Sequence, residues 1–437
     1  MTNCTTPSLS FSSLKRRKVE GHFSGGDITS DAGALLLREV DRRLELTQTL
    51  SEIIPDQRNP ELITHSLASL LKQRIYGLAL GYEDLNDHDT LRHDVALQTA
   101  VERDEVLASS STLCRLENRQ AKQVAFDMNA LLVEKFIQSF ESPPQELILD
   151  FDPTDDRVHG HQEQRFYHGY YKSYCFLPLY VFCGDHLLVS YLRPANIDGA
   201  RHAWAILALL VRRLRQQWPD VRLIFRGDSA CCRDRLLRWC ERQQVGYLVG
   251  LPRNKRLLAQ TETIRQQAEE AFNTSKEKQR LFTDFQYAAN SWQVTRRVII
   301  KAEHTDKGAN PRFITTNLPG EPQTLYDPVY CARGDMENRI KQQQLDLFAD
   351  RTSCHAWWAN QFRLLLSSMA YVLIDTLRRI GLQGTKWARA YAGTIRLKFF
   401  KLGAVIIRNT RRIRFLMASA YPYQAFFSLV VQRLRSG

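Results

Sequence analysis

Several features that define other classes of protein are missing from this 437-residue sequence. No apolar run approaches the roughly 18 residues that a membrane-spanning helix needs, and residues 1–22 lack the apolar stretch of a secretory signal peptide. The nine cysteines form no Cys-x-x-Cys pair, which disfavours both a disulfide framework and a structural zinc site. We therefore expect a cytoplasmic protein with reduced thiols and no membrane partner.

Acidic residues are missing from residues 376–437, which contain thirteen Lys and Arg. That number equals the net charge of the whole chain, +13, so the preceding residues are balanced. A basic block of this kind points to a polyanion, and nucleic acid is favoured over anionic lipid because no membrane-inserting helix is present. Within the block, residues 394–416 alternate basic and apolar residues as strands do. The residues expected to contact DNA here are Lys398, Lys401, Arg411 and Arg412.

The first 142 residues divide into a short polar segment and a helical region. Residues 1–26 are rich in Ser and Thr, contain the basic cluster 15–18, and are expected to be extended or flexible. Residues 27–142 show helical periodicity and capping residues, and we predict a helical DNA-binding domain. The segment 109–118 has the polar N-terminus of a helix that enters a major groove and carries Arg115, although ordinary capping explains its composition equally well.

The composition favours strands after the Pro-Pro pair at 143–144. Residues 143–254 alternate strands, one hairpin and helices, which is typical of an α/β layer with a mixed sheet. Residues 255–320 interrupt that pattern with a charged helix and strand-like segments, one of them containing Trp292, and we interpret them as a β-rich insertion. Residues 321–380 then return to the core as helices, and 381–437 form the basic C-terminal region.

Carboxylates stand at the ends of two predicted strands. Asp150 and Asp152 lie on one face of the first strand, because side chains alternate along a strand, and Asp228 follows a second apolar strand. Ligand sites of α/β sheets lie at this edge, and like charges this close together favour a bound cation. A turn with hydrogen-bonding Asp side chains is the alternative explanation of the first cluster.

A polar stripe runs along the helix predicted over residues 331–347. Five residues recur at intervals of three and four and so share one face of it: Tyr330, Arg333, Glu337, Lys341 and Gln344. A solvent-exposed face with a Glu–Lys pair explains this pattern in isolation. Beside the two aspartates, however, Glu337 supplies a third hard oxygen ligand, a set that suits Mg²⁺ or Mn²⁺. The sequence contains no glycine motif for a nucleotide cofactor.

Three motifs, in this order, resemble those of DDE transposases of bacterial insertion sequences. They are DFDPTDD, LIFRGDSA and the Tyr330-xx-Arg333-xxx-Glu337 pattern. The similarity is greatest to the insertion sequence 1380 family of the insertion-sequence-4 superfamily. The blocks STLCRLEN, YLRPAN and TIRLKFFKLGA also resemble that family, so the similarity spans about residues 20–420.

The resemblance implies a fold with a ribonuclease-H-like core, whose catalytic metal ligands are Asp152, Asp228 and Glu337. Asp152 is preferred to Asp150 because the first acid of the superfamily stands two residues before a Thr, as Asp152 stands before Thr154. Two ions, Mg²⁺ or Mn²⁺, are the implied cofactors, and they would support an in-line phosphoryl displacement.

The resemblance also implies residues that contact DNA. Tyr330 and Arg333 would contact the backbone near the cleaved end. The superfamily has a Lys seven residues after its Glu, where this chain has Gln344, and Lys341 on the same face is the substitute we expect. Some members stack a flipped base on a Trp of the insertion, a role open to Trp292, although a Trp in the core is favoured here.

The implied function is cut-and-paste transposition. The protein would bind the terminal inverted repeats of its element, cleave the DNA and join the 3′-hydroxyl ends to target DNA, as a homodimer in a synaptic complex at the bacterial nucleoid. Two alternatives remain open, a DNA-binding regulator of the element without catalysis and a standalone metal-dependent nuclease.

Overall fold

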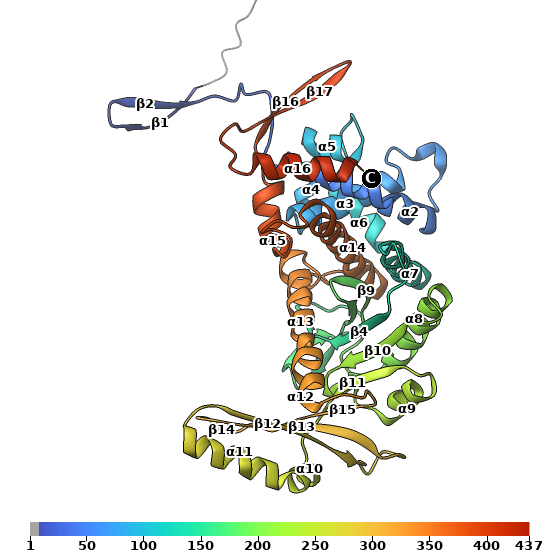
Figure 1. The fold of residues 1–437 in the computed structure, drawn as a ribbon. Coiled ribbons are helices and arrows are strands. Elements are labelled where there is room, and N and C mark those ends of the chain that lie inside the picture. The colour runs from blue at the N-terminus through green and yellow to red at the C-terminus, as the bar shows by residue number, and fades with distance from the viewer. Residues whose placement is uncertain (1–7, 437) are drawn as a thin grey trace, which may run out of the picture. The chain divides into compact units, whose positions relative to one another are not determined.

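The computed structural model describes residues 8–436, which form two compact units (Figure 1). The first unit combines the residues up to 119 with 346–348 and those from 369 onward, and the second combines 120–345 with 349–368. The helical N-terminal and the basic C-terminal regions, predicted as separate domains, thus share one unit. None of the helices in the described part of the chain has the length and hydrophobicity to cross a membrane.

The second unit is built on a nine-stranded sheet. Its strands follow the order β12-β13-β15-β11-β10-β4-β8-β9, and the short β14 pairs with β13. The strands of the predicted core are β4 (Glu146–Pro153), β8 (Leu179–Cys183), β9 (His186–Tyr191), β10 (Arg222–Gly227) and β11 (Gly246–Leu251). The others are β12 (Gln279–Tyr287), β13 (Arg296–Thr305), β14 (Gly308–Ala309) and β15 (Arg312–Thr316).

Three parallel strands, β4, β10 and β11, form the centre of this sheet. Their apolar residues are buried, as expected for a sheet covered by helices on both faces. The helix α8 (Ala203–Gln217) leads into β10, and α9 (Asp234–Arg242) connects β10 to β11; both contribute leucines to the same core. The predicted hairpin is β8–β9, which turns at Gly184 with a φ of 58°. The predicted mixed α/β sheet is therefore confirmed.

The segment predicted as an insertion extends the sheet of the core. Strand β15 pairs antiparallel with β11, and β13 and β12 continue outward from it. The charged helix of this segment is split into α10 (Lys255–Gln260) and α11 (Glu262–Ser275). Its strands use the free edge of β11, and Val298, Ile300 and Phe313 join the core cluster of the parallel strands.

The first unit packs helices against a small sheet. Its main helices are α1 (Ala34–Leu44), α2 (Leu46–Ile53), α3 (Leu67–Leu80), α5 (Val95–Val101), α6 (Ser110–Asn118) and α16 (Gln424–Arg435). Its three-stranded sheet has the order β17-β16-β3, formed by β17 (Arg412–Met417), β16 (Ala404–Asn409) and β3 (Asp27–Thr29). One face of that sheet packs on α5 through Ile406 against Val95 and Ala96.

Two segments of the first unit differ from their predictions. Residues predicted as extended or flexible form a hairpin of β1 (Leu9–Leu14) and β2 (Arg17–Gly21). The start of the predicted strand region 394–416 is helical instead, because α15 (Ala392–Ile395) continues into a π-helical turn, Arg396–Phe400. The alternation of basic and apolar residues there also fits a short helix that buries Ile395, Phe399 and Phe400.

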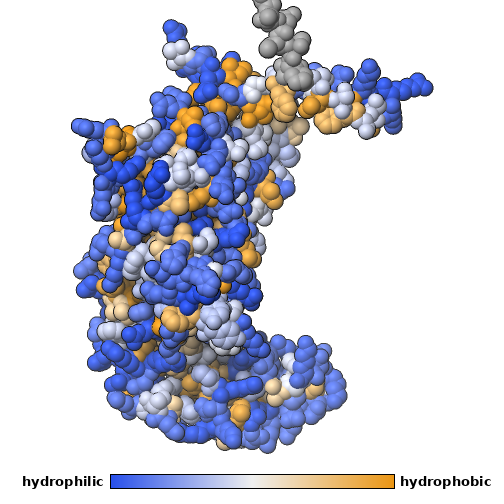
Figure 2. All heavy atoms as spheres, turned by 180° about the vertical axis from the view of Figure 1, so that it is seen from behind, coloured by the Kyte–Doolittle hydropathy of each residue, from blue (hydrophilic) through white to orange (hydrophobic). Residues whose placement is uncertain are grey.

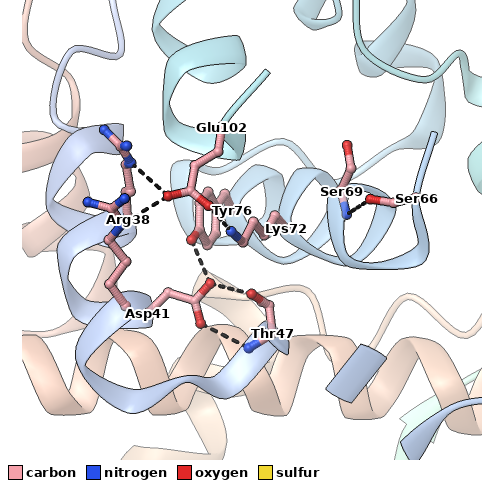
Figure 3. Close-up of polar contacts among 9 residues, drawn as sticks. Arg38, Asp41, Thr47, Ser66, Ser69, Lys72, Tyr76 and Glu102 are labelled. Carbon is pink, nitrogen blue, oxygen red and sulfur yellow. Dashed lines mark hydrogen bonds and ion pairs between the residues drawn. The ribbon is translucent and has the colours of Figure 1, made fainter. Parts of the chain in front are cut away.

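Polar contacts join the helices of the first unit, buried around Asp41 and more exposed around Glu102 (Figure 3). Asp41 of α1 accepts hydrogen bonds from the Thr47 backbone N–H at 2.9 Å and from the Tyr76 hydroxyl of α3 at 2.7 Å. Glu102, after α5, pairs with Lys72 of α3 and with Arg38 of α1. These contacts fix α1 to α3 and α5, since a buried polar group without its partner is costly.

The pair of Arg74 on α3 and Glu117 on α6 is buried on both sides, with Arg74 Nε 2.8 Å from Glu117 Oε1. We predict that Glu117→Ala lowers the free energy of unfolding of this unit by about 3–5 kcal/mol, because it leaves a buried guanidinium without its carboxylate. Urea unfolding monitored within the first unit measures the loss.

Glu105→Ala is the matched control, because Glu105 also lies 2.8 Å from an arginine, Arg103, yet its side chain is 76% exposed. That change should cost less than about 1 kcal/mol. Equal losses in the two variants would show that burial of the Arg74–Glu117 pair contributes nothing to stability.

Candidate active site

The carboxylates predicted at the strand ends lie on two neighbouring parallel strands. The register of β4 and β10 pairs Asp150 with Arg226 and Phe151 with Gly227. Asp152 and Asp228 therefore occupy the next position on each strand, at the same edge of the sheet. Asp228 also begins a 3-10 turn, where its side chain accepts a hydrogen bond from the Ala230 N–H at 3.0 Å.

The predicted Glu337 helix exists, but its geometry changes along its length. It begins with α12 (Pro322–Thr324), continues through a π-helical turn and a 3-10 turn, becomes α13 (Gly334–Lys341) and ends in a second π-helical turn. Arg333 Nη1 and Glu337 Oε1 are 3.5 Å apart, which confirms that these two side chains share a face. The Glu337 side chain is 54% exposed, so this end of the site is open.

Arg333 connects two of the three carboxylates. Its Nη2 lies 2.5 Å from Asp152 Oδ1, while its Nη1 faces Glu337. Burial alone would lower the pKa of Arg333, but the carboxylates of Asp152 and Asp228 outweigh it and raise that pKa. The guanidinium is thus the cation that partly neutralises this acidic edge.

The contact with Arg333 does not fully compensate for the burial of the Asp152 carboxylate. Burial raises its pKa to about 6; Arg333 opposes the shift, and the negative charges of Asp228 and Glu337 add to it. Arg333, Asp228 and Glu337 therefore all lie near enough to Asp152 to influence its charge. Within residues 8–436, however, no three His, Cys, Asp or Glu side chains stand close enough to hold a metal ion.

The other acids of the DFDPTDD motif have structural partners. Asp150 is buried and forms a two-pronged ion pair with Arg226, in which Nη2 and Oδ2 are 2.6 Å apart. Arg226 also donates to the Val329 carbonyl, which ties the strand to the helical segment that carries Arg333. Asp156 is buried too and accepts a hydrogen bond from Thr352 at 2.8 Å. These contacts leave Asp152 as the acid of the motif that faces Arg333.

Arg226 was not predicted as part of this site. An arginine within a buried strand needs a buried acid, and Asp150 at the same level of the adjacent strand is that acid. The LIFRGD pattern contains this signal, but it becomes specific only when the pairing of the two strands is known.

Tyr330 lies against the end of β11. Burial raises the pKa of its hydroxyl to about 12, so this group is a neutral hydrogen-bond donor at physiological pH. A Cβ at Gly250 would lie 2.7 Å from that hydroxyl and 2.9 Å from the Ser229 backbone N. Only glycine therefore permits Tyr330 and the Asp228 turn to approach β11 so closely.

A pocket of about 600 Å³ opens beside Asp228 and Tyr330. Three basic residues that were not predicted as site residues line it, Arg253, Lys301 and Arg312. They come from β13, β15 and the segment after β11, so the strands predicted as an insertion form one wall of the site. The positive charge of this wall follows from the sheet topology and has no signature in any single motif.

The remaining predicted residues of the second unit lie in different surroundings. Lys341 is exposed at the end of α13, and the Gln344 side chain donates a hydrogen bond to the Asp155 carbonyl at 2.9 Å. Trp292 was expected in a strand but lies in the turn before β13. Its ring meets Tyr287 edge-on and lies 5.0 Å from the Arg296 guanidinium, so Trp292 is partly buried against the core rather than within it.

The predicted DNA contacts of the first unit differ in availability. Arg411 and Arg412 are exposed at the turn of the β16–β17 hairpin, and Arg115 is exposed on α6. Lys401, by contrast, pairs with the buried Asp31 at 2.7 Å. Lys398 lies 5.4 Å from the ring of Tyr423. Of these five residues, only Arg411, Arg412 and Arg115 therefore present charges that the unit itself leaves exposed.

This chain belongs to the family "Transposase DDE domain group 1", whose model matches residues 11–437. It is thus a transposase of the DDE class. No curated protein matches the sequence. Among solved structures, the chain is similar to a cryo-EM structure of the piggyBac transposase synaptic complex with hairpin DNA, with a TM-score of 0.42 and 10% sequence identity; the match covers 93% of this chain and 82% of that chain.

We predict that the Asp152→Asn variant of the metal-free protein becomes more stable relative to the unsubstituted protein as the pH rises from about 4 to about 6. The pKa of Asp152 is about 6 when folded and roughly 3.9 when unfolded, so the folded chain binds more protons in this window and loses stability through it. Asparagine stays neutral, so the variant should gain roughly 2–3 kcal/mol over the unsubstituted protein above pH 6.

Urea unfolding across this pH range measures the difference, with Asp306→Asn in the exposed turn after β13 as control. The control should show no pH-dependent gain. A gain for Asp152→Asn that shrinks as the pH rises would contradict the assigned environment of Asp152.

Proposed function

We propose that this chain binds the terminal inverted repeats of its element, cleaves the DNA there and joins the 3′-hydroxyl ends to target DNA by cut-and-paste transposition. The observation that carries the proposal is the pairing of Arg333 with Asp152 and Glu337 at the sheet edge where Asp228 also lies. We further propose that the strand order β9-β8-β4-β10-β11 is a ribonuclease-H-like core, and that the element belongs to the insertion sequence 1380 family in the insertion-sequence-4 superfamily.

The chemistry of the site fits Mg²⁺ or Mn²⁺. Asp152 is buried among like charges, and its raised pKa shows that Arg333 alone does not satisfy its charged form. Carboxylate oxygens from Asp152, Asp228 and Glu337 would hold two such ions after the three side chains move toward each other, because they do not surround one point in this structure. When bound, these ions would activate a water or a 3′-hydroxyl and stabilise the leaving oxygen.

The side chains around the carboxylates are suited to a DNA strand. Arg333 can donate to a backbone phosphate from the face that also reaches Asp152, and the neutral Tyr330 hydroxyl can donate beside it. Lys341 supplies an exposed charge one turn beyond Glu337. Arg253 and Arg312 in the pocket beside Asp228 would neutralise phosphates next to the cut, whereas Lys301 is paired with Glu303 at 2.7 Å.

The first unit supplies the surface proposed for binding the inverted repeats. Arg411 and Arg412 project from a two-stranded hairpin, an element that the major groove admits, and Arg115 lies on a short helix with an exposed polar face. Double-stranded DNA, both ends and target, is therefore the proposed partner. We further propose a homodimer in the synaptic complex, acting at the bacterial nucleoid.

Two other activities would use the same DNA surface. A regulator of the element would bind the ends and leave them intact, and a nuclease would cut without joining. The raised pKa of Asp152 favours catalysis over regulation, because keeping this buried carboxylate beside two other acids is costly in a protein that only binds DNA. Strand-transfer products separate the transposase from the nuclease.

Asp228→Asn should lower cleavage and strand transfer at the ends of the element by at least about 100-fold, the loss expected when a group that acts in the transition state is removed. The test incubates the full chain with DNA that carries both ends of the element, in Mg²⁺ and in Mn²⁺. Binding to those ends should remain, because Asp228 contributes no positive charge.

Asp220→Asn, in an exposed turn before β10, removes the same charge away from the site and should retain full activity. Cleavage that survives Asp228→Asn would exclude this carboxylate from the chemistry. Binding without cleavage by the unsubstituted chain in either metal would favour the regulator.

A further inference from the structure

The β1–β2 hairpin is amphipathic. Its register pairs Phe11 with Val19 and Leu14 with Arg17, across a bulge at residues 12 and 13. Residues opposite each other share a face, so Leu9, Phe11, Leu14 and Val19 all lie on one side of the hairpin. The opposite side is polar.

This apolar side is uncovered in the single chain. The four side chains remain between 39% and 66% exposed. Figure 2 shows orange, hydrophobic atoms along the projecting arm among blue, hydrophilic ones. A two-stranded hairpin by itself is marginally stable in water, and clustered exposed apolar side chains mark an interaction surface. The hairpin therefore needs a partner surface.

The three-stranded sheet of the same unit has a matching uncovered side. Val405 of β16 pairs with Ile28 of β3 and with Leu416 of β17, which forms an apolar row across all three strands. With Ile407 these side chains are between 38% and 63% exposed. The opposite side of this sheet is already covered, because Ala404 and Ile406 are buried. The sheet is thus half of a sandwich whose second layer is missing.

We propose that two copies of this chain exchange their β1–β2 arms, each arm covering the sheet β17-β16-β3 of the other copy. Figure 1 shows the arm projecting away from its own sheet, so the single chain does not close on itself. The arm leaves β3 through residues 22–26, which include Gly26 at a φ of 73°. This glycine lets the chain turn between the arm and the sheet.

Reciprocal exchange buries more surface than a single arm could bury, as a stable dimer requires. One arm offers only four large apolar side chains, and a stable interface needs more than about 1,000 Å² of buried surface. A two-fold pair buries two arms and two sheet faces at once, because the same contact occurs twice.

DNA is a poor occupant of the row Ile28–Val405–Leu416, since a polyanion offers no counterpart to apolar side chains; Arg414 and Arg412 lie on the same side of the sheet but nearer to the hairpin turn. Lys18 of the basic cluster lies on the polar side of the arm and stays outside the contact, whereas Arg17, opposite Leu14, lies at the edge of the apolar side. The inference concerns the protein without DNA and is independent of the proposed chemistry, so its failure would leave the cleavage assay unaffected.

Sedimentation of the full-length protein without DNA tests the exchange. The unsubstituted chain should be a dimer. The double change Phe11→Ser with Leu14→Ser, and separately Ile28→Ser with Leu416→Ser, should each raise the dimer dissociation constant at least about 100-fold. The control Ser10→Ala with Lys18→Gln alters the polar side of the arm and should leave the dimer intact. A monomeric unsubstituted chain, or a dimer that survives both apolar changes, would overturn the proposal.

A photo-crosslinking residue in place of Phe11 separates the possible occupants without destabilising the fold. Exchange predicts a product of twice the chain mass, with the crosslink in residues 404–417 or 27–29. A product of single chain mass with the same crosslink would mean that the arm folds onto its own sheet. Crosslinks formed only to added duplex DNA would mean that the arm is a DNA-binding element. Either of these results overturns the exchange.

Discussion

The carboxylates at the edge of two parallel strands repel one another, and the arrangement of the site is constrained by the need to compensate that repulsion. Strands β4 and β10 place Asp150, Asp152 and Asp228 within two residues of the same level, and such a set is unstable unless cations separate the charges. The protein uses two arginines for this purpose. Arg226 neutralises Asp150 within the sheet, and Arg333 reaches Asp152 from the Glu337 helix. The two pairs differ in geometry, because Arg226 contacts both oxygens of Asp150, whereas Arg333 contacts one oxygen of Asp152 and also faces Glu337.

The Asp150–Arg226 pair helps to hold the Asp152–Arg333 pair in place. Arg226 also bonds the Val329 carbonyl, one residue before Tyr330, and Tyr330 in turn lies against Gly250 at the end of β11. The segment that carries Arg333 and Glu337 is therefore attached to two adjacent strands before it reaches Asp152. This rigidity matters chemically, since catalytic groups act efficiently only when the scaffold fixes their positions. The open side, where Glu337 is half exposed, is the side on which we propose that metal and DNA bind.

The sequence predicts those parts of the site that depend on local patterns. Alternation along a strand placed Asp150 and Asp152 on one face, the resemblance to the transposase superfamily selected Asp152, and helical spacing paired Arg333 with Glu337. The ion pair of Asp150 with Arg226 was missed, because its partners are 76 residues apart and meet only through strand pairing. The basic wall of the pocket was missed for a similar reason, since it forms when β13 and β15 extend the free edge of β11. For Lys401 the sequence predicted a DNA contact from charge alone. In the structure this lysine pairs with Asp31, which is far away in sequence.

The central claim is that Asp152, Asp228 and Glu337 hold divalent metal, with Arg333 as the cation that partly neutralises the site in its absence. The most direct measurement is anomalous diffraction at the manganese absorption edge from crystals of the full chain grown with Mn²⁺. We predict peaks at coordination distance, about 2.0–2.2 Å, from carboxylate oxygens of all three residues, with the Arg333 guanidinium displaced from Asp152. Manganese bound elsewhere, with Arg333 still paired to Asp152, would contradict the account.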